Sequence, residues 1–446
     1  MSAIAADMSS RCHDHDSLAI AGHQPEIMQE HCQHGDPAAP KSKRRKATSH
    51  PEEPQRLRAC LAGITLAGLW PKLTCLPARM ASDEELVLCH SREHLEGLKA
   101  ASLAAARLRR PLWLPPGGCL DGIGEEALTS KHLAGRDTYI TEGSLEAARF
   151  ASGALLSLVD ECLGGGSLQG LAFCRPPGHH AGLSSSTGFC LLNNVALAAQ
   201  YARARYPDLV KRVLIFDWDV HHGQGTQEIF WSDPDVLFVS IHQFEPGFYP
   251  NSGTAMETGA GKGKGYTINV AMPPGYGDDC LWLACAKVLL PAARTFRPDL
   301  VLVSAGFDAV EGDPLGGATC SPSIFGQITR ELKQLAQDLC HGRILFGLEG
   351  GYASAGLAMC VGNVAQALLE PKQRGNDEPF AIESDLSPKQ GSLLAIYSTR
   401  LAHQKLPLRL LEGSCCALVP FGTRASGTMR PEPRIDKPAE KSASTG

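Results

Sequence analysis

Five short stretches of the sequence contain residue types that can bind a metal ion and transfer protons. Carboxylates and imidazoles are metal ligands, and a histidine of near-neutral pKa transfers protons in hydrolytic reactions. A tyrosine after two glycines can approach a ligand closely and donate a hydrogen bond to a developing oxyanion. The candidates are His179, His180, Asp217, Asp219, His221, His242, Asp308 and Tyr352.

Three of these residues have the chemistry of a catalytic metal site. Asp219 and His221 are separated by one apolar residue, so the two-residue period of a strand predicts that they point the same way. Asp308, from another strand end, completes a set of two oxygens and one nitrogen. Three protein ligands with one open position are typical of catalytic zinc, whereas structural zinc is usually four-coordinate and Cys-rich. A lone Asp-x-His pair is more often a local cap, so the prediction depends on five strand ends acting together.

The elements that must position these residues alternate between short apolar runs and longer amphipathic runs, which is typical of an α/β protein. Strands that are apolar on both faces predict a three-layer αβα fold with a central, mostly parallel sheet. Ligands of such sheets bind beyond the carboxyl ends of the strands, where the candidates stand. The expected strands are 171–174, 213–216, 236–241, 266–270, 300–304 and 344–348. The expected helices are 144–163, 194–206, 279–295, 323–340 and 355–369.

Three parts are expected along the chain. Residues 1–49 are polar and predict a disordered tail, 50–370 predict the catalytic domain, and 371–446 predict a mostly irregular second tail. The basic run at 41–46 could be a nuclear import signal, although such runs are more often solvated charge. An apolar patch at 406–411 could dock on the domain. The sequence has no run of eighteen apolar residues, and its N-terminal acids argue against a signal peptide.

Composition narrows the possible functions. A net charge of -5 argues against direct nucleic-acid binding, although basic segments such as histone tails could still be substrates. The 16 cysteines lack the spacing of a disulfide framework, which suits a reducing compartment. We therefore expect the nucleus, the cytoplasm or both, and no membrane span.

The motifs resemble those of the class II histone deacetylases, in the arginase and deacetylase superfamily. The resemblance implies the arginase/deacetylase fold and removal of acetyl groups from N6-acetyl-lysine in proteins. Trp218 is more similar to class II than to class I. The matching stretches are 50–57, 175–181, 188–190, 217–223, 225–227, 304–309, 312–317 and 348–352.

The resemblance also implies two metal ions. One zinc ion per chain would activate water and polarise the acetyl carbonyl. Its ligands would be Asp219, His221 and Asp308. A structural potassium ion would lie beside it, bound by the side chain of Asp217 and by backbone carbonyls. Those carbonyls belong to Asp217, Asp219, His221, Ser240 and Ile241.

Acid–base roles follow from the same resemblance. His180 would be the general base that then protonates the leaving lysine amine. His179, hydrogen-bonded to Asp217, would be its electrostatic partner. Tyr352 would stabilise the tetrahedral oxyanion.

Substrate residues are implied as well. Phe189 and Tyr249 would form the walls of a tunnel for the lysine methylenes, and Gly188 would accept the scissile amide N–H. Leu315 stands where polyamine deacetylases of the family carry a glutamate, so a polyamine cation would stay unpaired. The expected partners are acetylated proteins or peptides, and possible corepressors.

Departures from the family pattern keep two rival functions open. Gln224 replaces the Asn or Asp that orients the second histidine, and Tyr249 replaces a commoner phenylalanine. Residues 108–136 form a longer loop than usual near the rim. An arginase-like ureohydrolase would share the fold but needs Asp-x-His-x-Asp for two manganese ions, which is absent after His221. A silent acetyl-lysine-binding scaffold is supported only by Gln224.

Overall fold

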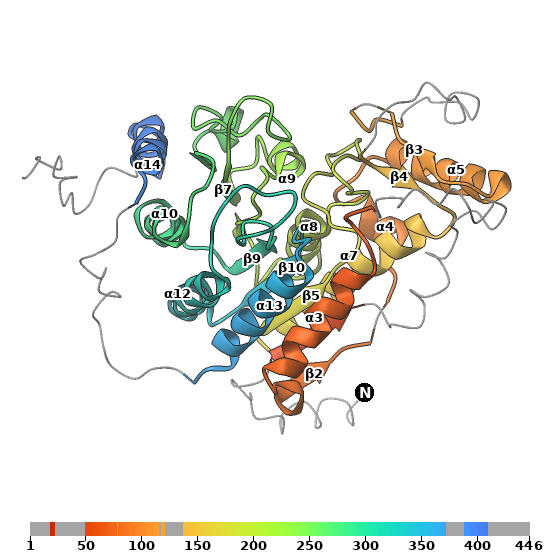
Figure 1. Ribbon diagram of the computed structural model, residues 1–446, viewed down its shortest axis with the longest axis horizontal. Helices are drawn as coiled ribbons and strands as arrows, with labels where there is room; N and C mark the ends of the chain where they lie inside the picture. The colour runs from red at the N-terminus through yellow and green to blue at the C-terminus, as the bar shows by residue number, and fades with distance from the viewer. Residues whose placement is uncertain are drawn as a thin grey trace, which may run out of the picture. The chain divides into compact units, whose positions relative to one another are not determined.

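A sheet of eight parallel strands forms the centre of the protein (Figure 1). The computed structural model describes residues 18–22, 50–77, 79–115, 117–120, 137–371 and 388–408. The strand order is β2-β1-β5-β10-β9-β6-β7-β8. The strands are β1 (Leu18–Gly22), β2 (Leu73–Cys75), β5 (Gln169–Phe173), β6 (Val213–Asp217), β7 (Val236–Gln243), β8 (Thr267–Met272), β9 (Leu300–Ala305) and β10 (Ile344–Leu348). All six expected strands are present, and the predicted three-layer fold is confirmed.

Helices cover both faces of the sheet. Successive side chains of a strand point to opposite faces and pack into two separate hydrophobic cores. In β6, Leu214 and Phe216 pack in one core, while Val213 and Ile215 pack in the other. The first core receives α3 (Gln55–Leu66), α10 (Asp278–Ala284), α11 (Leu290–Phe296), α12 (Pro322–Cys340) and α13 (Ser354–Leu369). The second receives α4 (Asp83–Leu86), α5 (Arg92–Leu108), α7 (Ser144–Leu163) and α8 (Asn194–Arg205).

The helix expected at 279–295 is interrupted. Between α10 and α11 the backbone forms a π-helical segment, Cys285–Leu289. Pro291 stands in the first turn of α11 and has no N–H to donate to the preceding turn. A π-helical turn is one way in which a helix accommodates such a gap.

The prediction of an unstructured tail over residues 1–49 is wrong at 18–22, which form β1 between β2 and β5. Every residue of β1 pairs with one of β5, and Leu18 is fully buried. Five residues are too few to show a strand period in the sequence. The rest of this segment, including the basic run at 41–46, lies outside the described residues.

Residues 371–446, expected to be mostly irregular, contain one described helix, α14 (Gln390–Ala402), which covers the edge strand β8. The Thr399 hydroxyl donates to the carbonyl of Asn269 at 2.7 Å, and Nε2 of His403 lies 3.0 Å from the carbonyl of Thr267. Edge strands leave such carbonyls unpaired unless another element covers them. The amphipathic signal of α14 is weak because its buried face carries these polar side chains. Leu408, in the expected docking patch, is buried.

The remaining elements are small. Strands β3 (Leu112–Trp113) and β4 (Tyr139–Ile140) form an antiparallel pair at the two sides of the long loop, of which 121–136 lie outside the described residues. A short helix, α9 (Gln224–Ile229), follows β6. Among the described helices, none has both the length and the apolar character needed to cross a membrane.

Candidate metal centre and active site

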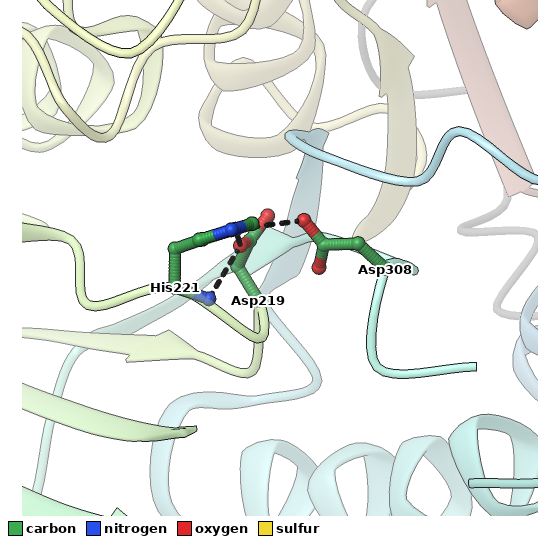
Figure 2. A group of neighbouring side chains, drawn as sticks. All are labelled: Asp219, His221 and Asp308. Atoms are coloured by element: carbon green, nitrogen blue, oxygen red, sulfur yellow. Dashed lines mark hydrogen bonds and ion pairs between the residues drawn. The ribbon is translucent and has the colours of Figure 1, made fainter. Parts of the chain in front are cut away.

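Asp219, His221 and Asp308 converge beyond the carboxyl ends of two adjacent strands, β6 and β9 (Figure 2). Nδ1 of His221 lies 3.1 Å from Oδ1 of Asp219 and 3.1 Å from Oδ2 of Asp308. One ligand atom from each residue lies within 4.8 Å of the others. Both carboxylates are buried. The structure therefore brings together the three residues that the sequence singles out as metal ligands.

Side-chain-to-backbone hydrogen bonds, rather than the pleat of a strand, produce this convergence. β6 ends at Asp217, so Asp219 and His221 lie in the following loop and the expected strand alternation is wrong there. Oδ1 of Asp217 accepts from the N–H of Asp219 at 3.0 Å, and Oδ1 of Asp219 accepts from the N–H of His221 at 2.9 Å. Such bonds between an aspartate and the backbone two residues on replace the strand ladder with tight turns. The Val220 N–H donates to Asp308 Oδ1 at 2.9 Å and ties the two loops together.

The donor set fits a divalent cation. Burial and the charge of Asp219 raise the pKa of Asp308 to about 7. Burial lowers the pKa of His221, but hydrogen bonds to Asp219 and Asp308 outweigh it and raise that pKa to about 10. The two carboxylates therefore favour positive charge at the imidazole nitrogen that both of them contact. Two buried carboxylates that hold an imidazolium form a site that favours positive charge, and oxygen and nitrogen ligands suit zinc.

His179 is fixed behind this centre by two acids. Its Nδ1 donates to Oδ2 of Asp217 at 2.9 Å, and its backbone N–H donates to Oε2 of Glu349 at 3.1 Å. Glu349 also accepts from the Gly178 N–H at 2.6 Å and from the Ser304 hydroxyl at 3.2 Å. Burial lowers the pKa of His179, but the charges of the neighbouring aspartates raise it well above its usual value. His179 is therefore a buried positive charge.

His180 has the opposite electrostatic character. Its ring centroid lies 3.9 Å from that of His179 and 5.9 Å from that of His221. Burial and these two neighbours lower the pKa of His180 well below its usual value. Its Nδ1 lies 2.6 Å from Oε1 of Gln224, whose amide nitrogen donates to the His180 carbonyl at 3.3 Å and to Thr187 Oγ1 at 3.2 Å. Since the amide oxygen must accept, Nδ1 carries the proton and Nε2 is free to act as a base.

Tyr352 lies on the loop after β10 and contacts one cationic and one aromatic side chain. The guanidinium of Arg56 is 4.8 Å from the centre of its ring, and Phe189 meets the ring edge-to-face at 5.9 Å. Burial raises the pKa of Tyr352 well above its usual value. The phenol therefore keeps its proton and can donate a hydrogen bond.

The expected substrate residues lie around the same centre. Gly188 has a φ of 56°, and a Cβ atom there would lie 2.3 Å from Cδ2 of His180, so no side chain fits at this position. Tyr249 meets His180 edge-to-face at 5.0 Å, whereas Phe189 packs near Tyr352. Leu315 is partly buried on the loop that follows Asp308, and its N–H donates to Asp313 at 3.0 Å.

The expected potassium residues lie on neighbouring strands. Asp217 of β6 is the register partner of Ser240 in β7, and Ile241 follows. The nearby candidate His242 is not among the three converging ligands. Its Nδ1 is hydrogen-bonded to the Ser240 hydroxyl at 2.8 Å, and its Nε2 donates to the Gly253 carbonyl at 2.9 Å. His242 is therefore a buried structural histidine, while the potassium ion stays a prediction.

Four residues around the site have no role in the sequence interpretation. Phe248 stacks on His221 with ring centroids 5.1 Å apart, and Arg56, Glu349 and Asp313 hold the loops that carry the chemistry. Arg56, Asp313 and Glu349 stand within the matching stretches, so their position was the available signal, whereas Phe248 lies outside them. Residue type alone would not have singled out Arg56, because Arg58 of the same helix is exposed.

Comparison with known proteins adds independent evidence. The Histone deacetylase domain family matches residues 50–368. Histone deacetylase 15 of Arabidopsis thaliana is 41% identical over 340 residues, which cover 75% of this chain and 55% of the relative. Polyamine deacetylase HDAC10 of Mus musculus is 40% identical over 356 residues, which cover 79% of this chain and 49% of the relative. The chain spans about half the length of these curated relatives.

A solved structure supports the fold. The crystal structure of the HDA15 HD domain aligns with a TM-score of 0.72 and 34% sequence identity. The alignment covers 89% of this chain and 96% of that chain. The similarity therefore extends over the sheet and its covering helices, in agreement with the expected arginase/deacetylase fold.

Proposed function

The chain belongs to the histone deacetylase family, and on that premise we propose that it is a zinc-dependent hydrolase that removes acetyl groups from N6-acetyl-lysine in proteins. One observation carries the proposal. The converging set of Asp219, His221 and Asp308 lies within ring-contact distance of a histidine with a free nitrogen, His180. Such a set combines a metal site with a general base, which hydrolysis of an amide requires.

Zinc is the cofactor that the donor set suits best. Asp219, His221 and Asp308 would hold it and leave a coordination position open for chemistry. When bound, zinc supplies Lewis acidity, which polarises a carbonyl group and makes water a stronger acid. Among the residues that the structure describes, one such set of three ligands is found, which favours this function over a two-manganese ureohydrolase.

The two histidines have different roles: His180 transfers the proton, and His179 stabilises charge. His180 has a free Nε2 and a lowered pKa, so it is neutral near pH 7 and can take a proton from the attacking water. It then returns the proton to the leaving lysine amine. His179, buried and positively charged beside Asp217, stabilises negative charge as it develops and disfavours a persistent charge on His180.

Tyr352 completes the set. Its raised pKa keeps the phenol protonated, so it can donate to the acetyl oxygen as negative charge develops there. A single well-placed donor of this kind contributes on the order of 3 kcal/mol to transition-state stabilisation.

The substrate is proposed to be a protein or peptide rather than a polyamine. Phe189 and Tyr249 supply aromatic surface for the lysine methylenes, and the carbonyl of Gly188 would accept the amide N–H. Leu315 offers no charge to a polyamine cation. One relative is named a polyamine deacetylase, so an acetylated polyamine is the right comparison substrate and should turn over at least tenfold less efficiently.

The proposal is tested with the purified full chain. We expect release of free lysine amine from a fluorogenic acetyl-lysine peptide, inhibition by a hydroxamate, and about one zinc ion per chain. Tyr352→Phe should keep the zinc but lower turnover about a hundredfold, as loss of an oxyanion donor does. Urea release from arginine would favour the ureohydrolase, and tight acetyl-peptide binding without turnover would favour the scaffold.

Potassium and cellular context complete the proposal. Asp217, with the carbonyls of Ser240 and Ile241 nearby, is proposed to bind a structural potassium ion, which should appear as potassium-dependent thermal stability. We also propose location in the nucleus, the cytoplasm or both, with corepressor-type protein partners. Fluorescence imaging of the tagged chain would test the location.

A further inference from the structure

The peptide group between Gly351 and Tyr352 is held by side-chain hydrogen bonds at both its oxygen and its N–H. Its oxygen accepts a hydrogen bond from Nε of Arg56 at 2.7 Å, and its N–H donates to Oδ2 of Asp313 at 2.6 Å. Gly351 has a φ of 113°, a region open to glycine and closed to most other residues. Glycine allows the following peptide group to rotate, so one hydrogen bond alone would not fix the plane of the Gly351–Tyr352 peptide.

Asp313 also holds the residue after Tyr352. Its Oδ2 accepts from the N–H of Ala353 at 2.9 Å, at the start of α13, whose own N-terminal residue provides no side-chain cap. Two adjacent N–H groups therefore point to one carboxylate oxygen. Negative charge at a helix N-terminus is stabilising, which strengthens this hold.

The carboxylate itself is fixed relative to the metal ligand Asp308. Its other oxygen accepts from the Leu315 N–H at 3.0 Å, and the Asp313 N–H donates to the Val310 carbonyl at 3.2 Å. Asp313 is 9% exposed, so little water competes for these bonds. The loop that carries Asp308 and the loop that carries Tyr352 are thus joined through one side chain.

We propose that Asp313 is a positioning residue for the reaction: it holds the backbone of Tyr352 so that the phenol keeps its place relative to Asp308. This inference rests on the proposed function. The carboxylate acts through Tyr352 and does not itself touch the substrate. A displacement of about 1 Å at a catalytic group can cost on the order of a hundredfold in rate.

The test compares full-length variants for zinc content, thermal midpoint and kinetics with an acetyl-lysine peptide. Asp313→Asn is nearly isosteric but leaves one amide oxygen for three N–H donors, and Asp313→Ser is a smaller alternative. Asp278→Asn is the matched control, because Asp278 accepts from the N–H and hydroxyl of Ser321 at the start of α12, at 2.7 and 2.6 Å.

We expect Asp313→Asn to lower kcat by about tenfold to a hundredfold with KM changed less than about twofold and zinc content unchanged. The Asp278 control should keep its kcat. In a Tyr352→Phe background, Asp313→Asn should lower the remaining kcat by less than about twofold, because both changes remove the same contribution. A purely structural role would not give this non-additivity.

Four results overturn the inference: wild-type kcat in the Asp313 variants, loss of zinc with the loss of kcat, an undiminished effect in the Tyr352→Phe background, or failure of both Asp313 variants to fold. An inactive wild-type chain would instead overturn the proposed function, on which the inference depends. The wild-type measurement therefore separates the two failures.

Discussion

The side chain of Gln224 reaches His180 at both ends of its amide, with its oxygen 2.6 Å from the imidazole Nδ1 and its nitrogen 3.3 Å from the His180 carbonyl. The imidazole is oriented by a neutral partner, which brings no negative charge to oppose burial and the neighbouring histidines. The pKa of His180 is accordingly lowered well below its usual value. Gln224 thus keeps the orienting function of the usual Asn or Asp, and its presence does not favour a silent scaffold.

A pH profile of Gln224→Glu tests this relationship. A general base works only while it is neutral, so kcat/KM falls as pH drops through its pKa. With zinc kept saturating, wild-type kcat/KM should stay level as pH falls below about 6.5, the usual histidine value. A carboxylate at 224 favours the imidazolium and should move the acid limb to higher pH. Gln224→Asn, which stays neutral, is the control and should not move the limb; identical limbs for Glu and Gln would contradict the assignment of His180 as the base.

Arg56 should matter for both stability and turnover. Its guanidinium is 2% exposed, donates to the carbonyls of Glu349 and Gly351, and pairs with Glu52 at 3.4 Å. Arg56→Met keeps much of the volume but leaves the buried carbonyls of Glu349 and Gly351 without this donor, while Glu52 keeps Arg175 as its ion partner at 2.8 Å. We expect a loss of about 2–4 kcal/mol in the free energy of unfolding, because each buried acceptor left without a donor costs about 1–3 kcal/mol. Urea denaturation measures it.

The same substitution should lower kcat, because Arg56 is one of the two groups that hold the Gly351–Tyr352 peptide. Arg58→Met, two residues along the same helix on an exposed position, is the matched control. Its stability and turnover should stay close to wild type. Equal effects from the two substitutions would show that helix α3, rather than the guanidinium, is responsible.

The strands and metal ligands could be predicted from the sequence because their signals are strong and local. Runs such as that of β9, buried at every residue, have no solvent-facing position that would blur the pattern. Asp219 and Asp308 are buried acids directly after two such runs, and the parallel order of β6 and β9 brings their ends together. The parallel pairing therefore accounts for the proximity of the ligands. Their orientation has another cause, because hydrogen bonds to the backbone rather than strand alternation orient Asp219 and His221.

The parts that escaped prediction depend on distant contacts. β1 is five residues long and is stabilised by pairing with β5, far along the chain. α14 buries Thr399 and His403 toward the edge strand and exposes Leu394 and Tyr397, so its sequence pattern indicates the wrong face. Asp313 caps a helix that begins forty residues later. No local pattern encodes such partners.

Zinc binding should strengthen as pH rises. In the metal-free site the pKa of His221 is about 10 and that of Asp308 about 7, so His221 is protonated at neutral pH and must lose that proton to become a ligand. The apparent affinity should rise by up to about tenfold per pH unit between pH 7 and 9. Calorimetry of zinc binding in buffers of different ionisation enthalpy should show about one proton released at pH 8. Binding without proton release would contradict this description of the site.

His90, which is hydrogen-bonded to the segment that follows His180, should make the stability of the protein depend on pH. Its Nδ1 donates to the Gly182 carbonyl at 2.9 Å, and its Nε2 accepts from the Asn193 N–H at 2.9 Å. The neutral ring therefore uses both nitrogens, and a second proton would face an N–H donor. Burial, with His94 nearby, lowers the pKa of His90 to about 3.

The sign of the pH effect follows from proton uptake. In the unfolded chain His90 binds a proton below about pH 6.5, whereas in the folded protein it does so only near pH 3. Its stabilising contribution is therefore complete above about pH 6.5 and falls as pH drops toward 3, by at most about 1.4 kcal/mol per pH unit. Urea denaturation of wild type and His90→Gln at pH 7.5, 6.5 and 5.5 measures it. The difference in unfolding free energy between the two proteins should shrink below pH 6.5, because glutamine takes up no proton in either state. A difference that stays constant across this range would mean that His90 titrates with the same pKa in the folded and the unfolded protein, and would contradict the lowered pKa.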